Sequence, residues 1–328
     1  MEPADAMSMI ETVNLTKRYG DFTALDSLDL RIEEGDCFGF IGPNGAGKTT
    51  TIKILATLLK PSSGQATING LTVGYQNRLI RPIIGYVPDF MGAYDDMMVG
   101  EYLEFFAAAY NIHGGQRKRV VADVLELTDL THKAVSEVNS LSRGMQQRLS
   151  VARVLLHDPK VLLLDEPASG LDPRARIEMR ELLKELKRMG KTILISSHIL
   201  HELAELCNAV GIIERGRLLY QGSVREALRK ARVGHVLHIA VLQRTEDAAE
   251  ALRAIPGVTR AEVQAADGEA VAGGDGHEIR VVLDERAGVD VSDIPNRLVN
   301  AGFRLTKFTE EAVNLETAFM RLTKGLVQ

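Results

Sequence analysis

Hydrophobic and polar residues alternate near the start of the chain. Over residues 10–35 the alternation has a period of two and is interrupted by glycine- and acid-rich turns, which predicts an antiparallel β element. Further along, residues 38–41, 161–165 and 192–197 are nearly continuous apolar runs. Such runs are typical of parallel strands buried on both faces, and helical stretches separate them. The pattern therefore predicts an α/β domain with a mainly parallel sheet.

The pattern becomes helical in the middle of the chain and changes again near residue 230. Amphipathic helices are predicted at 101–110 and 120–127, within a helical subdomain of about residues 90–158. Beyond 230 the predicted order is βαββαβ, which suits a small α+β, ferredoxin-like sandwich. Its elements are strands at 236–241, 258–264, 278–283 and 303–309 and helices at 246–254 and 292–301. We expect two domains, 1–232 and 233–328, the second accessory or regulatory.

The clearest chemical signal is a glycine-rich loop between a predicted strand at 38–41 and a predicted helix at 51–59. It reads Gly42-Pro43-Asn44-Gly45-Ala46-Gly47-Lys48-Thr49-Thr50, the G-x-x-x-x-G-K-T pattern of a phosphate loop. Glycines let successive backbone N–H groups turn inward around phosphate oxygens, and the helix N-terminus adds partial positive charge. Lys48 would reach the β- and γ-phosphates, and the Thr49 hydroxyl would ligate Mg²⁺. The flanking strand and helix favour this interpretation over a chance match.

Two carboxylates follow the apolar run at 161–165. Asp165 and Glu166 stand where that strand ends, and ligands bind at the carboxyl ends of strands in open α/β sheets. Asp165 would hold Mg²⁺ through water beside Thr49. Glu166 would polarise the attacking water as general base. The competing interpretation is a helix cap or a solvated acidic pair.

Three further positions are candidates for nucleotide contacts. His198 ends a strand expected beside the Asp165 strand, which would bring its imidazole near a γ-phosphate, although an isolated histidine is often structural. Tyr19, ahead of the phosphate loop, could stack on an adenine. Ser142 could cap a helix predicted at 149–157. That cap is either ordinary or part of an anion site for a phosphate from another molecule.

Composition narrows the class of protein. The 328 residues are 45% hydrophobic with a net charge of −5, so no basic field indicates a nucleic-acid partner. The two cysteines, Cys37 and Cys207, are interpreted as reduced core thiols. The N-terminus lacks the apolar segment of a signal peptide, and no apolar stretch is long enough to span a bilayer.

Taken together, these motifs resemble the ATPase domain of the ABC superfamily, a P-loop NTPase fold. The phosphate loop, Leu-Ser-x-Gly, Asp-Glu-Pro, Ser169-Gly170-Leu171-Asp172 and the following histidine occur in the family's order, over roughly residues 10–230. The resemblance implies a dimer, of this chain or with a paralogous subunit, that sandwiches two ATP molecules with Mg²⁺. Each ATP would lie between the phosphate loop of one subunit and the Leu-Ser-x-Gly signature of the other. By position, Tyr19 resembles the adenine-stacking aromatic, Ser142 and Gly144 the γ-phosphate contacts in trans, and Asp172 the link between the two sites.

The chain departs from the family pattern at two places. Arg143 and Met145 replace the usual Gly and Gln of the signature. Asp89 stands after Tyr86-Val87-Pro88, where the family usually has Gln. An aspartate there could ligate Mg²⁺ directly or through water, but it cannot donate a hydrogen bond when ionised.

Residues 314–323 are similar to the ending of ATPase subunits whose permease is a separate polypeptide, in the drug, polysaccharide and lipid exporter group. The resemblance implies an exporter subunit at the cytoplasmic face of the cell membrane that hydrolyses ATP to ADP and phosphate. The rival is a soluble ABC ATPase acting on ribosomes or DNA, but such proteins usually carry two ATPase domains or long coiled-coil inserts. A catalytically dead regulatory subunit is disfavoured because Lys48, Asp165, Glu166 and His198 are all present.

Overall fold

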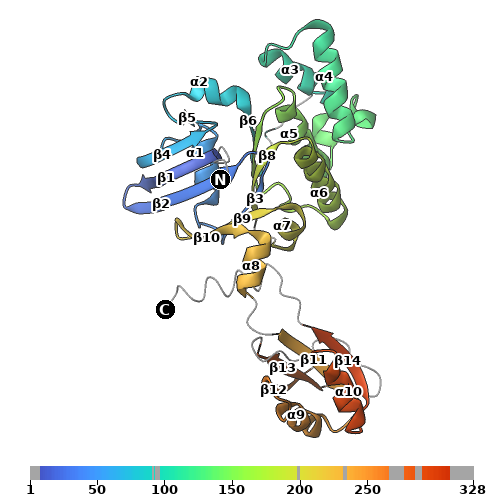
Figure 1. Cartoon of the computed structure of the whole chain (residues 1–328). Helices are drawn as coiled ribbons and strands as arrows, with labels where there is room; N and C mark the ends of the chain where they lie inside the picture. The colour runs from blue at the N-terminus through green and yellow to red at the C-terminus, as the bar shows by residue number, and fades with distance from the viewer. Residues whose placement is uncertain are drawn as a thin grey trace, which may run out of the picture. The chain divides into compact units, whose positions relative to one another are not determined.

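A computed structural model describes residues 8–90, 92, 97–197, 200–231, 235–265, 277–284 and 290–310. The chain forms two compact units, one built on Met1–Ala227 and the other on Leu228–Ala318 (Figure 1). The division falls within α8 (Val224–Ala231), shortly before the predicted boundary at 232/233. His198 and the ending at 314–323 lie outside the described residues.

The first unit begins with the predicted antiparallel β element. Four strands form a sheet in the order β2-β1-β4-β5: β1 (Ser8–Tyr19), β2 (Phe22–Glu33), β4 (Ser63–Ile68) and β5 (Leu71–Thr72). The period-two pattern is visible in β2, where Leu28, Leu30 and Ile32 are buried while Asp29 and Arg31 between them are exposed. Alternation of this kind leaves one face of the sheet for the core and the other for solvent.

A six-stranded sheet with the order β10-β9-β3-β8-β7-β6 forms the centre of the unit. Its strands are β3 (Cys37–Ile41), β6 (Ile84–Val87), β7 (Val161–Asp165), β8 (Thr192–Ser197), β9 (Ala209–Glu214) and β10 (Arg217–Ser223). All neighbours pair in parallel except β9 and β10, which form an antiparallel hairpin. Every residue of β3, β7 and β8 is buried, which explains their continuous apolar sequences. The parallel pairing of β7 with β8 confirms the predicted neighbourhood of the two strands.

Helices α5 and α6 lie on the side of this sheet away from the antiparallel sheet, α3 and α4 pack against α5, and α2 lies beside β5 (Figure 1). The helices are α1 (Lys48–Leu55), α2 (Asn77–Ile80), α3 (Val99–Ala109), α4 (Gly114–Leu127), α5 (Arg143–Leu155), α6 (Pro173–Arg188) and α7 (Leu200–Leu206).

Two helices have bounds that differ from those predicted. The helix expected at 149–157 begins at Arg143, because Ser142 is extended and its hydroxyl accepts the Met145 N–H. The helix expected at 51–59 begins at Lys48 and ends at Leu55. Shortly after that end, Thr57 has a φ of +62°, which interrupts the helical path.

The second unit confirms the predicted βαββαβ order. Its elements are β11 (His235–Val241), α9 (Thr245–Arg253), β12 (Val258–Ala265), β13 (His277–Leu283), α10 (Asp293–Asn300) and β14 (Leu305–Glu310). The sheet order is β12-β13-β11-β14 and all its pairs are antiparallel. Apolar residues of α9 and α10 pack with those of the strands into a core of its own.

Candidate nucleotide site

The phosphate loop connects β3 to α1 and lines a cleft of about 390 Å³. Its backbone path requires glycine at two positions. A Cβ at Gly42 would collide with the carbonyl oxygen of Ile213, and Gly47 has a φ of +111° with a Cβ position only 2.6 Å from Leu25 Cδ2. The loop is thus packed against neighbouring strands through positions that no side chain could occupy.

Lys48 is buried and contacts both the phosphate loop and the residue that follows β7. Its Nζ donates hydrogen bonds to the carbonyl oxygens of Gly42, at 2.6 Å, and Pro43, at 3.3 Å. The same ammonium forms an ion pair with Glu166 Oε1 at 3.4 Å. The phosphate loop and the carboxylate at the end of β7 therefore meet in one place, as the sequence predicted.

Asp165 lies at the last position of β7 and receives two hydrogen bonds. The Thr49 hydroxyl donates to its Oδ1 at 3.0 Å, and the Ser196 hydroxyl donates to the same oxygen at 2.8 Å. Burial raises the pKa of Asp165; these two hydrogen bonds oppose that shift, and the nearby charges of Glu166 and Asp89 reinforce it. Ser196 was not predicted as a site residue, because its contact depends on the pairing of two strands.

Glu166 follows directly after β7 in a strained conformation. Its φ is +51°, a left-handed value that costs a residue other than glycine on the order of 1 kcal/mol. Its N–H donates to the Ser196 hydroxyl at 3.0 Å. The carboxylate thus leaves the strand with its backbone held by a side chain of the neighbouring strand.

Two aromatic side chains line the cleft. Tyr19 and Phe22 are paired across the turn between β1 and β2, and both are partly exposed. The ammonium of Lys17 lies 5.0 Å from the centre of the Tyr19 ring. Phe22 was missed, although its place opposite Tyr19 across a short turn was a usable signal.

The two departures from the family pattern lie close together. Asp89 lines the cleft, and its Oδ1 is 4.0 Å from the guanidinium of Arg143. That guanidinium covers Gly170, where a Cβ would lie 2.5 Å from Arg143 Nη1. Nearby, burial and then the charges of Asp165 and Asp89 raise the pKa of Tyr86 to about 12.

The signature residues do not line the phosphate-loop cleft of the described chain. Ser142 caps α5 by accepting the Met145 N–H at 3.3 Å, which confirms the predicted capping role. Gly144 packs against α6, where a Cβ would lie 2.6 Å from Ala175 Cβ. Asp172 caps α6 in turn, since its Oδ1 accepts the Ala175 N–H at 2.9 Å.

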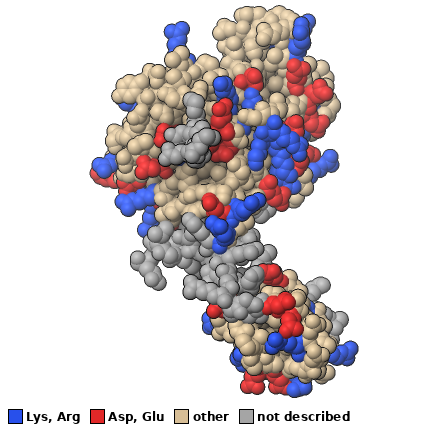
Figure 2. All heavy atoms as spheres, in the orientation of Figure 1, with Lys and Arg blue, Asp and Glu red and all other residues tan. Residues whose placement is uncertain are grey.

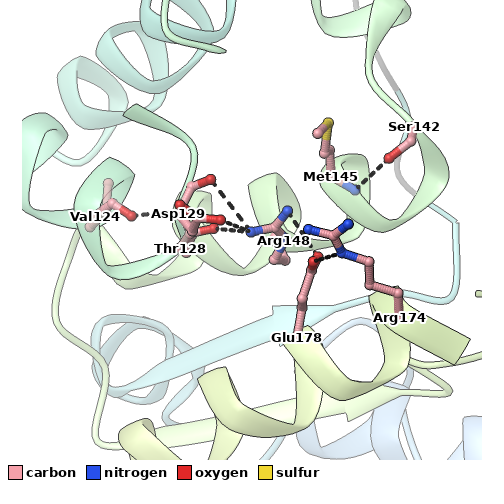
Figure 3. A network of polar contacts seen from close by, with 8 residues as sticks. All are labelled: Val124, Thr128, Asp129, Ser142, Met145, Arg148, Arg174 and Glu178. Atoms are coloured by element: carbon pink, nitrogen blue, oxygen red, sulfur yellow. Dashed lines mark hydrogen bonds and ion pairs between the residues drawn. The ribbon is translucent and has the colours of Figure 1, made fainter. Parts of the chain in front are cut away.

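A polar network holds the signature helix between its neighbours (Figure 3). The Arg148 side chain on α5 is only 7% exposed, and its Nη1 donates to the carbonyl oxygen of Thr128 at 2.9 Å. It also forms ion pairs with Asp129 and with Glu178 of α6, both at 3.3 Å. Glu178 shares its carboxylate with Arg174. Sequence reasoning missed this network, which joins α4, α5 and α6.

The charged surface of the first unit is mixed. Figure 2 shows Lys and Arg side chains gathered over α6, with acidic side chains among them. Several of these cations pair with glutamates of the same helix, as in Arg174–Glu178 and Lys184–Glu181. None of the helices in the described part of the chain has the length and apolar character needed to cross a membrane.

Comparisons with known proteins agree with this site. A family model described as ABC transporter matches residues 25–169. The Nod factor export ATP-binding protein I of Burkholderia orbicola is 40% identical over 229 residues, covering 70% of this chain and 75% of that protein. The linearmycin resistance ATP-binding protein LnrL of Bacillus subtilis is 29% identical over 318 residues, covering 96% of this chain and 98% of that protein.

Solved structures support the same assignment. A dimeric ATP-binding cassette in a post-hydrolysis state, bound to ADP and phosphate, has a TM-score of 0.60 and 27% identity. The similarity covers 66% of this chain and 98% of that chain. The chain therefore belongs to the ABC transporter family, as a subunit that binds and hydrolyses ATP.

Proposed function

We propose that this chain powers the export of a substrate through a separate membrane permease. The observation that supports it is the convergence of Lys48, Thr49, Asp165 and Glu166 in one cleft of a chain whose relatives are named for export and drug resistance. The similarity to the linearmycin resistance protein extends over nearly the whole chain, so it includes the second unit. The proposal places the chain at the cytoplasmic face of the cell membrane, where ATP is available.

In this proposal the nucleotide lies along the cleft with its phosphates on the loop. Backbone N–H groups from Asn44 to Thr50 would surround the phosphate oxygens, and the Lys48 ammonium would lie against the β- and γ-phosphates. Tyr19 would stack on the adenine, with Phe22 beside it at the same end of the cleft. His198 would contact the γ-phosphate from the end of β8.

The donor set at Thr49 and Asp165 fits Mg²⁺. A hydroxyl and a carboxylate already share a hydrogen bond of 3.0 Å there, and both are the hard oxygen ligands that Mg²⁺ prefers. No group of three His, Cys, Asp or Glu side chains suited to a metal occurs among the described residues. Phosphate oxygens and water would supply the remaining ligands, and Asp89, which lines the same cleft, would act through water. When bound, the cation neutralises negative charge on the phosphates.

Glu166 would act as the general base for the attacking water. Its carboxylate is paired with the Lys48 ammonium at 3.4 Å. Phosphates bound on the loop would attract the same ammonium, and Glu166 would accept a proton from the attacking water. Lys48 would therefore contact both the phosphates and the general base.

The active form in this proposal is a dimer, either of two copies of this chain or with a paralogous ATPase subunit. Ser142 and Gly144 lie at the start of α5 and outside the cleft of their own chain, and a helix N-terminus placed in this way could bind a γ-phosphate held by a partner. Asp172, at the start of α6, would link the two sites.

The dimer and the base can be tested together. Glu166→Gln should retain ATP and form a stable dimer at saturating Mg-ATP, because the change removes proton acceptance and leaves the phosphate loop intact. Size-exclusion chromatography with light scattering measures the mass, and wild-type protein with ADP is the control. A Glu166→Gln monomer in saturating Mg-ATP would contradict the sandwich dimer.

The permease requires a separate experiment. The tagged full chain, purified from its own cells in mild detergent, should carry a polytopic membrane protein at roughly equal stoichiometry. Mass spectrometry identifies the partner. Recovery of ribosomal or DNA-repair proteins in its place would refute the transporter assignment and leave the ATPase intact.

A further inference from the structure

Ser196 contacts both carboxylate residues of the nucleotide site from the neighbouring strand. It is fully buried in β8, opposite Asp165 in the parallel ladder. Its hydroxyl donates to Asp165 Oδ1 at 2.8 Å and accepts the Glu166 N–H at 3.0 Å. A hydroxyl has one donor and two acceptor sites, so it makes both bonds at once.

The bond to Glu166 acts where the β7 strand ends. The ladder between β7 and β8 pairs residues up to Asp165 and Ser196. At the next residue the backbone turns to a φ of +51°, and the Ser196 side chain binds its N–H. Strained conformations persist only where the surroundings determine them. The Ser196 hydroxyl is one of the contacts that hold this turn.

The bond to Asp165 is independent of the phosphate loop. Thr49 and Ser196 both donate to Oδ1, which leaves Oδ2 outside these two bonds. If Thr49 is engaged by a cation, Ser196 still orients the carboxylate. Groups that hydrogen-bond a metal-binding carboxylate in this way set its direction and its affinity for the metal.

We propose that Ser196 is a positioning residue that fixes Asp165 and Glu166 relative to each other. The rate of hydrolysis and the Mg²⁺-dependent part of nucleotide affinity depend on it, whereas binding by the phosphate loop does not. The inference rests on the proposed function, since it uses the roles assigned there to the two carboxylates.

The same strand supplies a matched control. Thr192 begins β8, is as fully buried as Ser196, and its hydroxyl accepts the Gly35 N–H at 2.9 Å. Its bond lies at the opposite end of the strand from the cleft. Thr192→Val removes a buried hydroxyl without touching the site, so it measures the general effect of such a loss on β8.

The test uses the purified full chain and the variants Ser196→Ala, Ser196→Thr and Thr192→Val. Steady-state ATP hydrolysis gives kcat and KM, and a fluorescent ATP analogue gives affinity in EDTA and in Mg²⁺. We expect Ser196→Ala to lose roughly 10- to 100-fold in kcat, because small displacements of reacting groups have effects of this size. Its affinity for the ATP analogue in EDTA should stay within about twofold of wild type. The increase in that affinity on addition of Mg²⁺ should be smaller than in wild type. Ser196→Thr, which keeps the hydroxyl, should recover most of the rate.

The inference is overturned if Ser196→Ala keeps the wild-type kcat and also gains as much nucleotide affinity on addition of Mg²⁺ as wild type does. It is also overturned if affinity in EDTA falls as much as the rate, or if Thr192→Val loses as much as Ser196→Ala, since either result means general damage to the strand. Lys48→Ala separates this failure from that of the proposed function. Hydrolysis by Lys48→Ala at the wild-type rate would refute the proposed site, and this inference with it.

Discussion

Replacing Arg148 by methionine should destabilise the first unit, because the arginine joins three helices from a buried position. Its guanidinium contacts the end of α4 at Thr128 and Asp129, and α6 at Glu178 (Figure 3). Methionine keeps an unbranched apolar stem of similar reach, so the change removes the charge and its bonds and leaves little cavity.

The magnitude follows from the exposure of each partner. The bond to the buried Thr128 carbonyl is charge-assisted and contributes about 1.5–3 kcal/mol. Asp129 is 81% exposed, so that ion pair adds little, about 0–1 kcal/mol. Glu178 keeps Arg174 as a partner and is not left unpaired. Among the described residues, the buried Arg148 Nε has no hydrogen-bond partner, so the loss of this nitrogen offsets part of the cost. We therefore expect a loss of about 2–3 kcal/mol in the free energy of unfolding.

Differential scanning calorimetry of the full chain measures this effect. For a unit of this size, each kcal/mol lowers Tm by about 2–4 °C, so the transition of the first unit should fall by about 4–12 °C. Arg174→Met is the matched control: its side chain is 90% exposed and contacts the same Glu178, so its effect should stay within about 0.5 kcal/mol. The reasoning is refuted if Arg148→Met melts like wild type, or if both variants lose the same amount.

The remaining predictions concern single charges. Lys48→Ala should abolish ATP binding in isothermal titration calorimetry, because the ammonium that joins the loop to Glu166 is lost; an unchanged affinity would contradict the phosphate-loop assignment. In the second unit, burial raises the pKa of Glu278, but the hydrogen bonds to its carboxylate, led by that from Lys307, outweigh burial. The pKa of Glu278 therefore falls from 4.5 to about 2. Because this pKa is lowered on folding, the ionised group contributes stability above pH 4.5 that is lost as the pH falls towards about 2, on the order of 3 kcal/mol. Across that pH range, chemical denaturation should show that the free energy of unfolding of Glu278→Gln depends less on pH than that of wild type. Parallel pH profiles for the two proteins would contradict the role of Glu278. Asp89→Gln should raise the Mg²⁺ concentration for half-maximal hydrolysis by up to about tenfold, and an unchanged requirement would exclude Asp89 as a cation ligand.

The sequence by itself determined the elements whose chemistry is local. The phosphate loop is one continuous segment, so its glycines, Lys48 and the flanking strand and helix are visible together. Asp165 and Glu166 were predictable in the same way, because an apolar run marks the strand and the carboxylates mark its end. The βαββαβ order of the second unit also followed from periodicity, since each element has its own hydrophobic pattern.

Only the tertiary structure decided which side chains from distant segments meet. Ser196 looks like any polar residue at the end of a strand until β8 is paired with β7, which places its hydroxyl on both Asp165 and Glu166. The role of Arg148 was not predicted, because its partners lie at the end of α4 and on α6. The hydrophobic periodicity of α5 does not indicate which helices pack against it. Hydrophobic pattern reports which face of an element is buried, but not which neighbour buries it, and that choice is made by the packing of the whole chain.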